Sequence, residues 1–239
     1  MRHLFLLAAL FCACISYAQI RVQERLPKSK TGFALTTAKT RAKIYYDVND
    51  ALVIKRSAEL FARDIQMVTG QKPELIQKRE RAKALVIVGT IEKNQWIREL
   101  AQKRKIDIRP LQGAWERYLI QTVDNPSPGV AKALVIAGSD RRGAAYGLFS
   151  ISEMMGVSPW YWWGDVPVKT HKALYVDAPP TYSKTPSVKY RGIFLNDEDW
   201  GLKPWAAKTF EKERGNIGPR TYAKICELLL RLKANHLAP

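Results

Sequence analysis

The sequence has 239 residues, of which 46% are hydrophobic, 26% charged and 10% aromatic. This composition excludes a disordered chain, a collagen and a low-complexity fibre. The length allows one full domain and part of another, because a domain takes roughly 100–200 residues. The 39 Lys and Arg residues against 22 Asp and Glu give a formal charge of +17, which favours an acidic partner such as a nucleic acid, an anionic surface or an acidic polysaccharide.

The first 18 residues have the three-part pattern of a secretory signal peptide. A basic start, MRH, precedes the apolar stretch 4–15, and the small residues Ser16 and Ala18 end the segment before Gln19. The apolar stretch is too short to span a bilayer, which needs about 20 residues. We therefore prefer cleavage after Ala18 over a membrane anchor or a lipoprotein signal at Cys14, and expect a secreted or periplasmic protein without a membrane span.

Cysteine usage agrees with an exported chain that has no disulfide. Cys12 and Cys14 leave with the signal peptide, so Cys226 is the one cysteine of the expected mature sequence. It lies in a helical pattern with apolar neighbours, which predicts a buried small hydrophobe rather than a nucleophile.

Residues 19–177 are expected to form a small mixed-sheet α/β domain at the N-terminus. The basic segment 21–40 shows no periodicity and is interpreted as a lead-in. Strands and helices then alternate, as in an α/β fold. The expected strands are 43–47, 84–88, 116–124, 133–137 and 173–177, with a hairpin turn at 125–129; the expected helices are one ending at Thr69 and capped by Asn49 or Asp50, then 94–103 and 142–155.

A proline-containing segment, 178–187, is interpreted as a linker to a second region, 188–239. This region begins with a strand that runs into acidic residues, followed by a helix at 221–233 and the start of another strand at Asn235. Strand, loop, helix and strand form the first unit of a (β/α)8 barrel, a fold of about 250 residues, so we expect a truncated, incomplete barrel. Because an unclosed barrel strand leaves its edges unpaired, we expect 188–239 to be poorly ordered.

The glycine-rich segment 138–147, GSDRRGAAYG, lies where a strand turns into a helix. Its backbone N–H groups and two arginines, Arg141 among them, could hold an anion. The spacing does not match the G-x-G-x-x-G dinucleotide fingerprint. A structural turn with Tyr146 in the core is the preferred interpretation.

Four consecutive aromatic residues, WYWW at 160–163, lie in a segment with Gly and Pro. Sugar rings present C–H faces that stack on Trp and Tyr, so this segment is a candidate carbohydrate site. A hydrophobic plug at the domain interface is an equally good interpretation, and both can hold if one Trp faces the ligand.

The acidic run Asn196-Asp197-Glu198-Asp199 follows the first strand of the second region. Carboxylates at the C-terminal end of a barrel strand face the active-site mouth, and adjacent acids repel each other unless a ligand, cation or Arg compensates. The alternative is a solvated loop, which suits Glu198 and Asp199 better than Asp197. The basic segment 203–220 is interpreted as a solvent-facing loop on the substrate side, and no His, Cys or Asp spacing indicates a metal site.

Four segments together resemble glycoside hydrolase family 115, the secreted bacterial xylan α-1,2-glucuronidases. They are GSDRRGAAYG at 138–147, GVSPWYWWGDVP at 156–167, YRGIFLNDE at 190–198 and LKANHL at 232–237. The resemblance follows the whole mature chain in order, with the most specific motifs from Gly138 onwards. It implies a small α/β domain followed by a catalytic (β/α)8 barrel.

The resemblance also implies a function. The family removes α-1,2-linked glucuronic or 4-O-methylglucuronic acid from glucuronoxylan by inversion, without a cofactor, and its full-length members can dimerise. Asp197 matches best as the catalytic residue, either a substrate-contacting or a base-side carboxylate. The expected substrate-binding residues are Asn196, Glu198, Trp162, Asp165 and Arg141. We expect the 239-residue chain to be an N-terminal fragment that is inactive alone, because the later barrel strands carry most of the family's catalytic carboxylates.

Two other functions remain open. The first is a non-catalytic module that binds acidic polysaccharide through its aromatic segment and cations. The second is an exported basic protein that binds nucleic acid. Its positive charge is spread along the sequence without an Arg-rich tail, so we expect no nucleic-acid partner.

Overall fold

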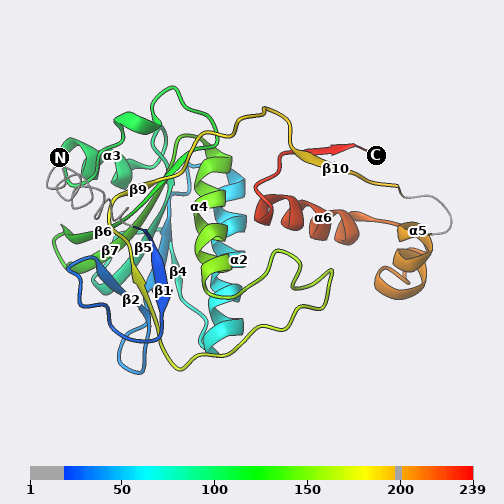
Figure 1. The fold of residues 1–239 in the computed structure, drawn as a ribbon, viewed down its shortest axis with the longest axis horizontal. Helices are drawn as coiled ribbons and strands as arrows, with labels where there is room; N and C mark the ends of the chain where they lie inside the picture. The colour runs from blue at the N-terminus through cyan, green and yellow to red at the C-terminus, as the bar shows by residue number, and fades with distance from the viewer. Residues whose placement is uncertain (1–18, 197–200, 239) are drawn as a thin grey trace, which may run out of the picture.

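The computed structural model describes residues 19–196 and 201–238. Its centre is a six-stranded mixed sheet in the order β4-β3-β5-β7-β6-β9. Strands β3, β4, β5 and β7 run parallel, whereas β6 and β9 run antiparallel to their neighbours. The strands are β3 (Lys43–Tyr46), β4 (Leu75–Ile76), β5 (Ala82–Thr90), β6 (Tyr118–Ser127), β7 (Val130–Gly138) and β9 (Thr181–Tyr182). The predicted α/β class, mixed sheet and hairpin are thus confirmed (Figure 1).

Helices cover both faces of this sheet, which explains why its central strands are continuously apolar. Side chains alternate between the faces of a strand, so Val86 and Val88 of β5 join one core cluster while Leu85 and Ile87 join another. The first cluster packs under α2 (Leu52–Thr69) and α4 (Arg141–Met154), which lie side by side in Figure 1, and the second packs under α3 (Gln95–Gln102).

The helix boundaries follow mostly local signals. Asn94 caps α3 by accepting a hydrogen bond from the Ile97 N–H, and Gly70 ends α2 with a left-handed φ of 72°. The predicted cap of α2 is wrong: the helix follows Ala51 without a side-chain cap. The Asp50 carboxylate instead accepts from the backbone N–H of Thr90 at 2.7 Å, because the two parallel strands end at the same edge.

A second sheet corrects the interpretation of 21–40 as a lead-in. Its order is β1-β8-β2, with β1 (Arg21–Gln23) and β2 (Gly32–Thr36) antiparallel to β8 (Leu174–Asp177). Phe33 and Leu35 are fully buried in the same core cluster as Val176. Local periodicity missed these strands because their partner lies more than 130 residues away in sequence.

The hairpin strands are longer than expected, and the expected linker contains a short strand. Strands β6 and β7 extend to Ser127 and Val130, which shortens the predicted turn at 125–129. Within the predicted linker, β9 pairs with β6 through Leu119 opposite Tyr182, so this segment continues the main sheet.

The C-terminal region forms one strand–helix–strand unit. Strand β10 (Gly192–Phe194) pairs in parallel with β11 (His236–Ala238), and α6 (Pro219–Arg231) connects them. One edge of β10 is therefore paired, contrary to the expectation of unpaired edges. A side chain at position 192 would clash, because a Cβ there would lie 2.0 Å from the His236 carbonyl oxygen. That this unit opens a (β/α)8 barrel stays a prediction.

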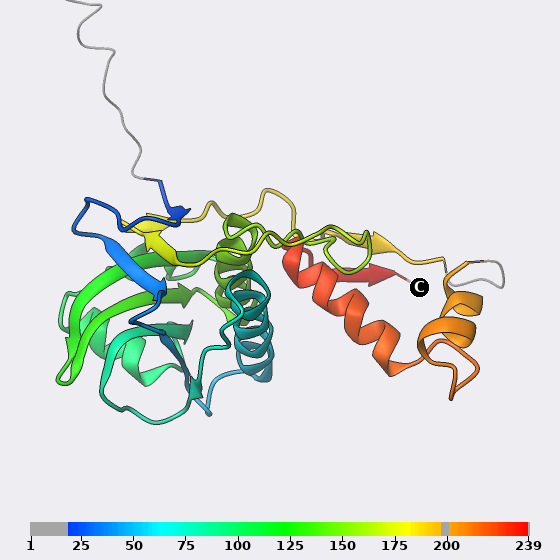
Figure 2. The ribbon, with the colours of Figure 1, turned by 90° about the horizontal axis from the view of Figure 1, so that it is seen from below.

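Part of the predicted solvent-facing loop 203–220 is helical. It contains α5 (Leu202–Trp205) and a five-residue π-helical turn, η2 (Ala206–Phe210). Figure 2 shows the whole C-terminal unit extending to one side of the α/β region, with α6 beside the helices that cover the sheet.

Candidate active-site corner

The carboxyl ends of β10 and β11 define the candidate site. The Leu195 N–H donates to the Ala238 carbonyl at 2.8 Å, and the exposed Asn196 follows. Beneath this end, Ile225 and Leu229 of α6 pack with Leu195 in a small apolar cluster. Residues that follow the carboxyl ends of barrel strands carry catalytic groups. Asp197 and Glu198, the predicted catalytic and substrate-binding acids, lie outside the described residues.

Four aromatic rings gather beside this corner. The ring centroid of Trp162 lies 4.7 Å from Trp163, 5.1 Å from Phe210 and 6.0 Å from Trp205, in edge-to-face arrangements. Trp205 also stacks on Phe210 at 5.5 Å. Edge-to-face and offset stacked pairs are the favoured aromatic geometries. The cluster therefore ties the 160–163 segment to α5 and η2, which sequence periodicity did not predict.

The four consecutive aromatics divide into different environments. Trp160 is 46% exposed. Tyr161 is half-buried, and its hydroxyl donates to Glu227 at 2.9 Å. Trp163 packs against the apolar cluster of α6, as expected of a plug, while Trp162 stays half-buried at the corner. Trp163 thus fits the interpretation as a hydrophobic plug, and Trp162 is exposed enough for the interpretation as a carbohydrate site. Sugar contact by Trp162 stays a prediction.

Lys224 is a candidate site residue that sequence analysis missed. Its ammonium nitrogen lies 4.8 Å from the Trp162 ring centroid and 3.4 Å from a Glu227 carboxylate oxygen. Burial lowers the pKa of Lys224, although Glu227 counteracts the shift. A positive group beside an aromatic face is suited to a sugar carboxylate. The available sequence signal was its i, i+3 spacing from Glu227 within the expected helix 221–233.

Arg141 and Asp165 are not brought to the Trp162 ring. Arg141 is exposed at the first turn of α4. Its neighbour Arg142 binds the Glu116 carboxylate, and the same carboxylate binds Arg191, the residue before β10. Residues 191 and 196 are five strand positions apart, which is roughly 16 Å. Asp165 is exposed, in a loop with a left-handed φ of 50°.

Glu116 occupies the place where the glycine-rich turn could have held an anion. Its carboxylate is fully buried and accepts from Arg142 at 2.6 Å and from Asn235 at 2.8 Å, as well as from Arg191. Burial alone would raise the pKa of Glu116, but these donors outweigh it and hold the pKa below its usual value. Asp140 accepts from the first N–H groups of α4. The turn is thus satisfied by carboxylates of the chain, as the structural interpretation predicts, with Tyr146 buried.

A second buried charge cluster joins α6 to α2. The Arg231 guanidinium donates two hydrogen bonds to Asp64, at 2.7 and 2.8 Å, and contacts Glu227 at 2.9 Å. Arg63 reaches the same Glu227 oxygen at 2.6 Å. Burial would raise the pKa of Glu227, but the guanidinium groups of Arg231 and Arg63 outweigh it and lower the pKa. This cluster fixes the orientation of the helix that carries Lys224.

Two further findings concern the described residues, 19–196 and 201–238. They contain no group of three or more His, Cys, Asp or Glu side chains placed to hold a metal ion. None of their helices combines the length and apolar character that a membrane crossing requires. Cys226 is exposed, which contradicts its predicted burial, and it lines a groove of about 760 Å³ between α2 and α6.

Comparisons with known proteins bear on this arrangement. The model of glycosyl hydrolase family 115 matches residues 183–239, which include the corner. The solved structure of a family GH115 4-O-methyl-α-glucuronidase, BtGH115A, with specificity for decorated arabinogalactans, is 36% identical over 86% of this chain, with a TM-score of 0.70. The present chain spans 25% of the length of that structure.

More distant similarities add nothing to the assignment. A GH20 β-N-acetylhexosaminidase from Streptomyces coelicolor A3(2) is 14% identical with a TM-score of 0.43, covering 92% of this chain and 32% of its own. CpGH84D is 12% identical with a TM-score of 0.45, covering 94% and 36%. No curated protein sequence matches the chain. The family-model match at the corner and the 36% identity across most of the chain agree with each other, and the chain belongs to glycoside hydrolase family 115.

Proposed function

We propose that this chain forms the N-terminal part of an inverting enzyme that removes α-1,2-linked glucuronic or 4-O-methylglucuronic acid from glucuronoxylan. The observation that carries the proposal is the 36% identity, over 86% of the chain, to a 4-O-methyl-α-glucuronidase. That relative is specific for decorated arabinogalactans. The leaving sugar is therefore the better supported part of the substrate, and both polymers belong in the test.

The corner suits a negatively charged sugar. Lys224 places a positive charge over the Trp162 ring, on the helix that connects β10 to β11. In the proposed mechanism Lys224 attracts the carboxylate of the glucuronic acid, Trp162 contacts the sugar face, and Asp197 acts on the base side, where it activates a water molecule.

Inversion needs a second carboxyl group as the acid, roughly 6.5–9.5 Å from the base. The acids 197–199 are adjacent in sequence and cannot bracket a sugar ring. Two nearby described carboxylates are already engaged. Glu227 binds Arg63, Arg231, Tyr161 and Lys224. Glu211 is buried and accepts from the Thr221 N–H at 2.9 Å and the Gly218 N–H at 3.0 Å at the beginning of α6.

We therefore propose that the 239-residue chain has no measurable glucuronidase turnover by itself, because the acid comes from barrel strands that it does not contain. We also propose that the signal peptide is cleaved after Ala18 and that the protein is secreted. N-terminal sequencing of the exported protein checks this step: a sequence that begins at Gln19 is expected, and one that begins at Met1 would contradict it.

The activity test joins this chain to the remaining barrel of a full-length family member and measures glucuronate released from glucuronoxylan and from arabinogalactan. The joined protein should be active, and Asp197→Asn should lower kcat by about 10³-fold or more, since it removes a catalytic carboxylate. The matched control, Asp199→Asn, removes one charge from the same run and should change kcat little. Turnover by the 239-residue chain, or full activity of the Asp197→Asn protein, would contradict the proposal.

A further inference from the structure

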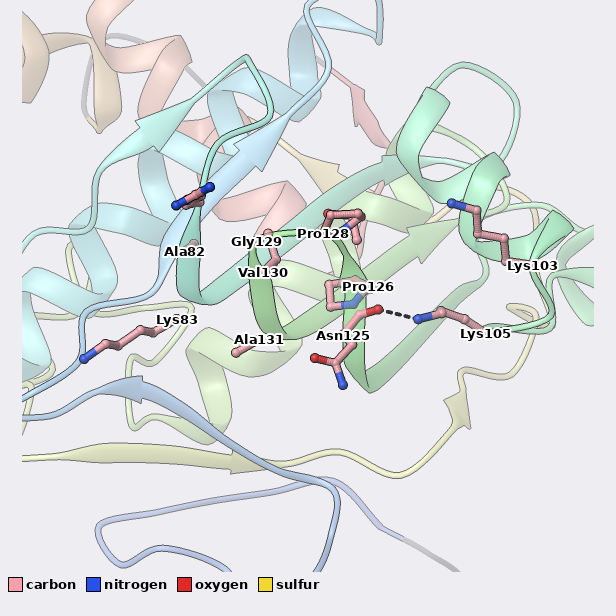
Figure 3. Close-up of a pocket in the computed structure, with 12 residues that line it drawn as sticks. Ala82, Lys83, Lys103, Lys105, Asn125, Pro126, Pro128, Gly129, Val130 and Ala131 are labelled. Carbon is pink, nitrogen blue, oxygen red and sulfur yellow. Dashed lines mark hydrogen bonds between the residues drawn. The ribbon is translucent and has the colours of Figure 1, made fainter.

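A depression lined by cations and no carboxylate lies at the hairpin turn between β6 and β7. It has a volume of about 750 Å³, and its walls come from the beginnings of β5 and β7, the end of α3 and the turn itself. We call this depression the basic hollow and define it by Arg81, Lys83, Lys103, Lys105 and the turn at 125–129. Figure 3 shows Lys103 and Lys105 on one side of the turn and Lys83 on the other.

The charge of the basic hollow is not compensated by its lining, which contains four cations and no carboxylate. Elsewhere on the same sheet the cations are paired. Lys43 contacts Glu74 at 2.8 Å, and Arg79 contacts Glu99 at 2.7 Å. Among residues 19–196 and 201–238, no carboxylate forms an ion pair with the exposed Arg81, Lys83 or Lys103. A concave surface of one charge sign raises the local concentration of ligands of the opposite sign.

The turn gives the basic hollow a rigid base. The strand register shifts between Asp124 and Ser127, and Asn125 adopts a left-handed φ of 46°. The Lys105 ammonium group donates to the Asn125 carbonyl oxygen (Figure 3). Gly129 has a φ of 82°, and a Cβ there would lie 2.9 Å from the Arg81 side chain. Asn125 is exposed and brings a polar amide to the basic hollow, and the exposed Pro128 ring offers an apolar face.

A second depression continues the positive surface. It has a volume of about 650 Å³, shares Lys105 with the basic hollow, and includes Arg104, Arg109 and Tyr182. Asp107 neutralises Arg109 at 2.8 Å, but Arg104 is exposed. Two adjoining depressions that share Lys105 suit an extended polymer better than a single small anion.

The contents of this surface do not suit a single-stranded nucleic acid. Single-stranded nucleic acids are bound by rows of aromatic side chains on which successive bases stack. The basic hollow has no aromatic side chain in its lining, and the hydroxyl of Tyr182 in the second depression is bonded to the Asp107 carbonyl at 2.7 Å. Lysines separated along a shallow surface suit carboxylates that branch at intervals from a neutral sugar backbone.

We propose that the basic hollow is an accessory binding site for a polysaccharide that carries uronic acid groups. The inference rests on the proposed function, which supplies such a polymer. The basic hollow lies at the beginnings of β5 and β7, whereas the catalytic corner lies beyond α4 on the C-terminal unit (Figure 2). One polymer bound at both places would be held at a higher effective concentration than either site provides by itself.

The test is the triple variant Arg81→Gln, Lys83→Gln and Lys103→Gln in the 239-residue protein. Lys105 is retained because it supports the turn. The matched control is Lys93→Gln, Arg98→Gln and Lys184→Gln, three exposed cations outside the basic hollow. Both variants lower the formal charge from +17 by three, so nonspecific attraction decreases equally.

Binding is measured by isothermal titration with glucuronoxylan, with the same polymer after carboxyl reduction, and with single-stranded DNA, all at one low ionic strength. The basic-hollow variant should bind glucuronoxylan about tenfold more weakly and the control less than about twofold more weakly. Thermal unfolding should show that both variants are folded. Carboxyl-reduced polymer should bind the wild-type protein as weakly as glucuronoxylan binds the basic-hollow variant.

Three results would overturn the inference: equal losses in the two variants, no binding of glucuronoxylan by the wild-type protein, or tighter binding of DNA that is lost in the basic-hollow variant. Because the measurement needs no turnover, its outcome is separate from the activity of the joined enzyme. An inactive joined enzyme with intact binding would contradict the proposed function, and an active enzyme with unchanged binding in the variant would contradict this site.

Discussion

The α/β region and the C-terminal unit of this molecule are stabilised by different interactions. The α/β region has two large apolar clusters, one on each face of its sheet. The C-terminal unit has a small cluster with three buried members, Ile225, Leu229 and Ala234. Its attachment adds, to the aromatic contacts of Trp162 and Trp163, the buried carboxylates Glu116 and Asp64 and the arginines that bind them. The hydrophobic effect is non-directional, so apolar side chains can be buried in more than one relative orientation. A buried ion pair is favourable only when its charged groups meet in one geometry.

The comparison has a consequence for the candidate site. The ion clusters orient α6 and β10, and these elements carry Lys224 and lead into Asp197. Changes in the charge clusters should therefore displace the corner while leaving the sheet folded. Changes in the sheet core should destabilise the α/β region first.

The largest effect is expected from Arg231→Ala. It leaves the buried Asp64 carboxylate, which is fully excluded from solvent, without its partner. Such a loss costs about 3–5 kcal/mol. Hydrogen exchange should show faster exchange in α6 and β10 and little change in β5. The matched control is Arg220→Ala at the beginning of the same helix, whose ion pair is exposed. Equal loss of protection in β5 would mean that the two regions unfold as one unit.

Leu134→Ala tests the apolar core of the α/β region. Leu134 lies in the central strand β7 and is fully buried. The substitution should lower the free energy of unfolding by about 2–5 kcal/mol, because it leaves a cavity in the core. Urea denaturation measures this loss, and its size should not depend on salt concentration. A loss below about 1 kcal/mol would contradict the placement of Leu134 in a tightly packed core.

Glu116→Gln should have a smaller effect of about 1–3 kcal/mol, because the amide keeps the shape but removes the charge that binds Arg142 and Arg191. The measurement is protection of β10 from hydrogen exchange. Protection equal to that of the wild-type protein would show that the charge of Glu116 does not hold the strand.

The attachment should also depend on pH. The pKa values of Glu116 and Glu227 are lowered in the folded protein. The stability that these two carboxylates contribute is therefore complete above their unfolded-state pKa of about 4.3. It is lost as the pH falls through their folded-state pKa values. Burial raises the pKa of Tyr161 to about 12, so its contribution is lost as the pH rises from about 10 toward that value. Exchange rates of α6 between pH 3 and pH 7, compared with those of β5, check the acid limb.

Arg56→Gln is expected to have the smallest effect, below about 1 kcal/mol, because its ion pair with Glu59 on α2 is exposed to solvent. Thermal unfolding at low and high salt should give nearly the same midpoint as the wild-type protein. A larger loss would show that charge on α2 contributes more than its exposure indicates.

Much of the fold could be predicted because its signals are local. The run ALVIV in β5, the hairpin with its Pro and Gly residues, and the periodic helices at 94–103 and 142–155 each follow from residues close together in sequence. The lead-in at 21–40 was misinterpreted because β1 and β2 are short and their partner, β8, is distant in sequence. The exposure of Cys226 was missed because it depends on how α6 docks.

For the candidate site, the residue types were predictable and their partners were not. The aromatic segment and the acidic run were apparent as unusual sequences. That Trp162 meets Phe210, and that Lys224 lies over its ring, depends on the docking of α5, η2 and α6.

The sequence by itself determined the α/β class, most strands and helices, and the resemblance to family 115, since these depend on periodicity, capping and short motifs. Tertiary structure decided which charges became buried. Asp64 and Arg231 are 167 positions apart, and neither has a local pattern that distinguishes it from a solvated residue. They pair because α2 and α6 bring them together in the protein interior, where an unpaired charge is costly.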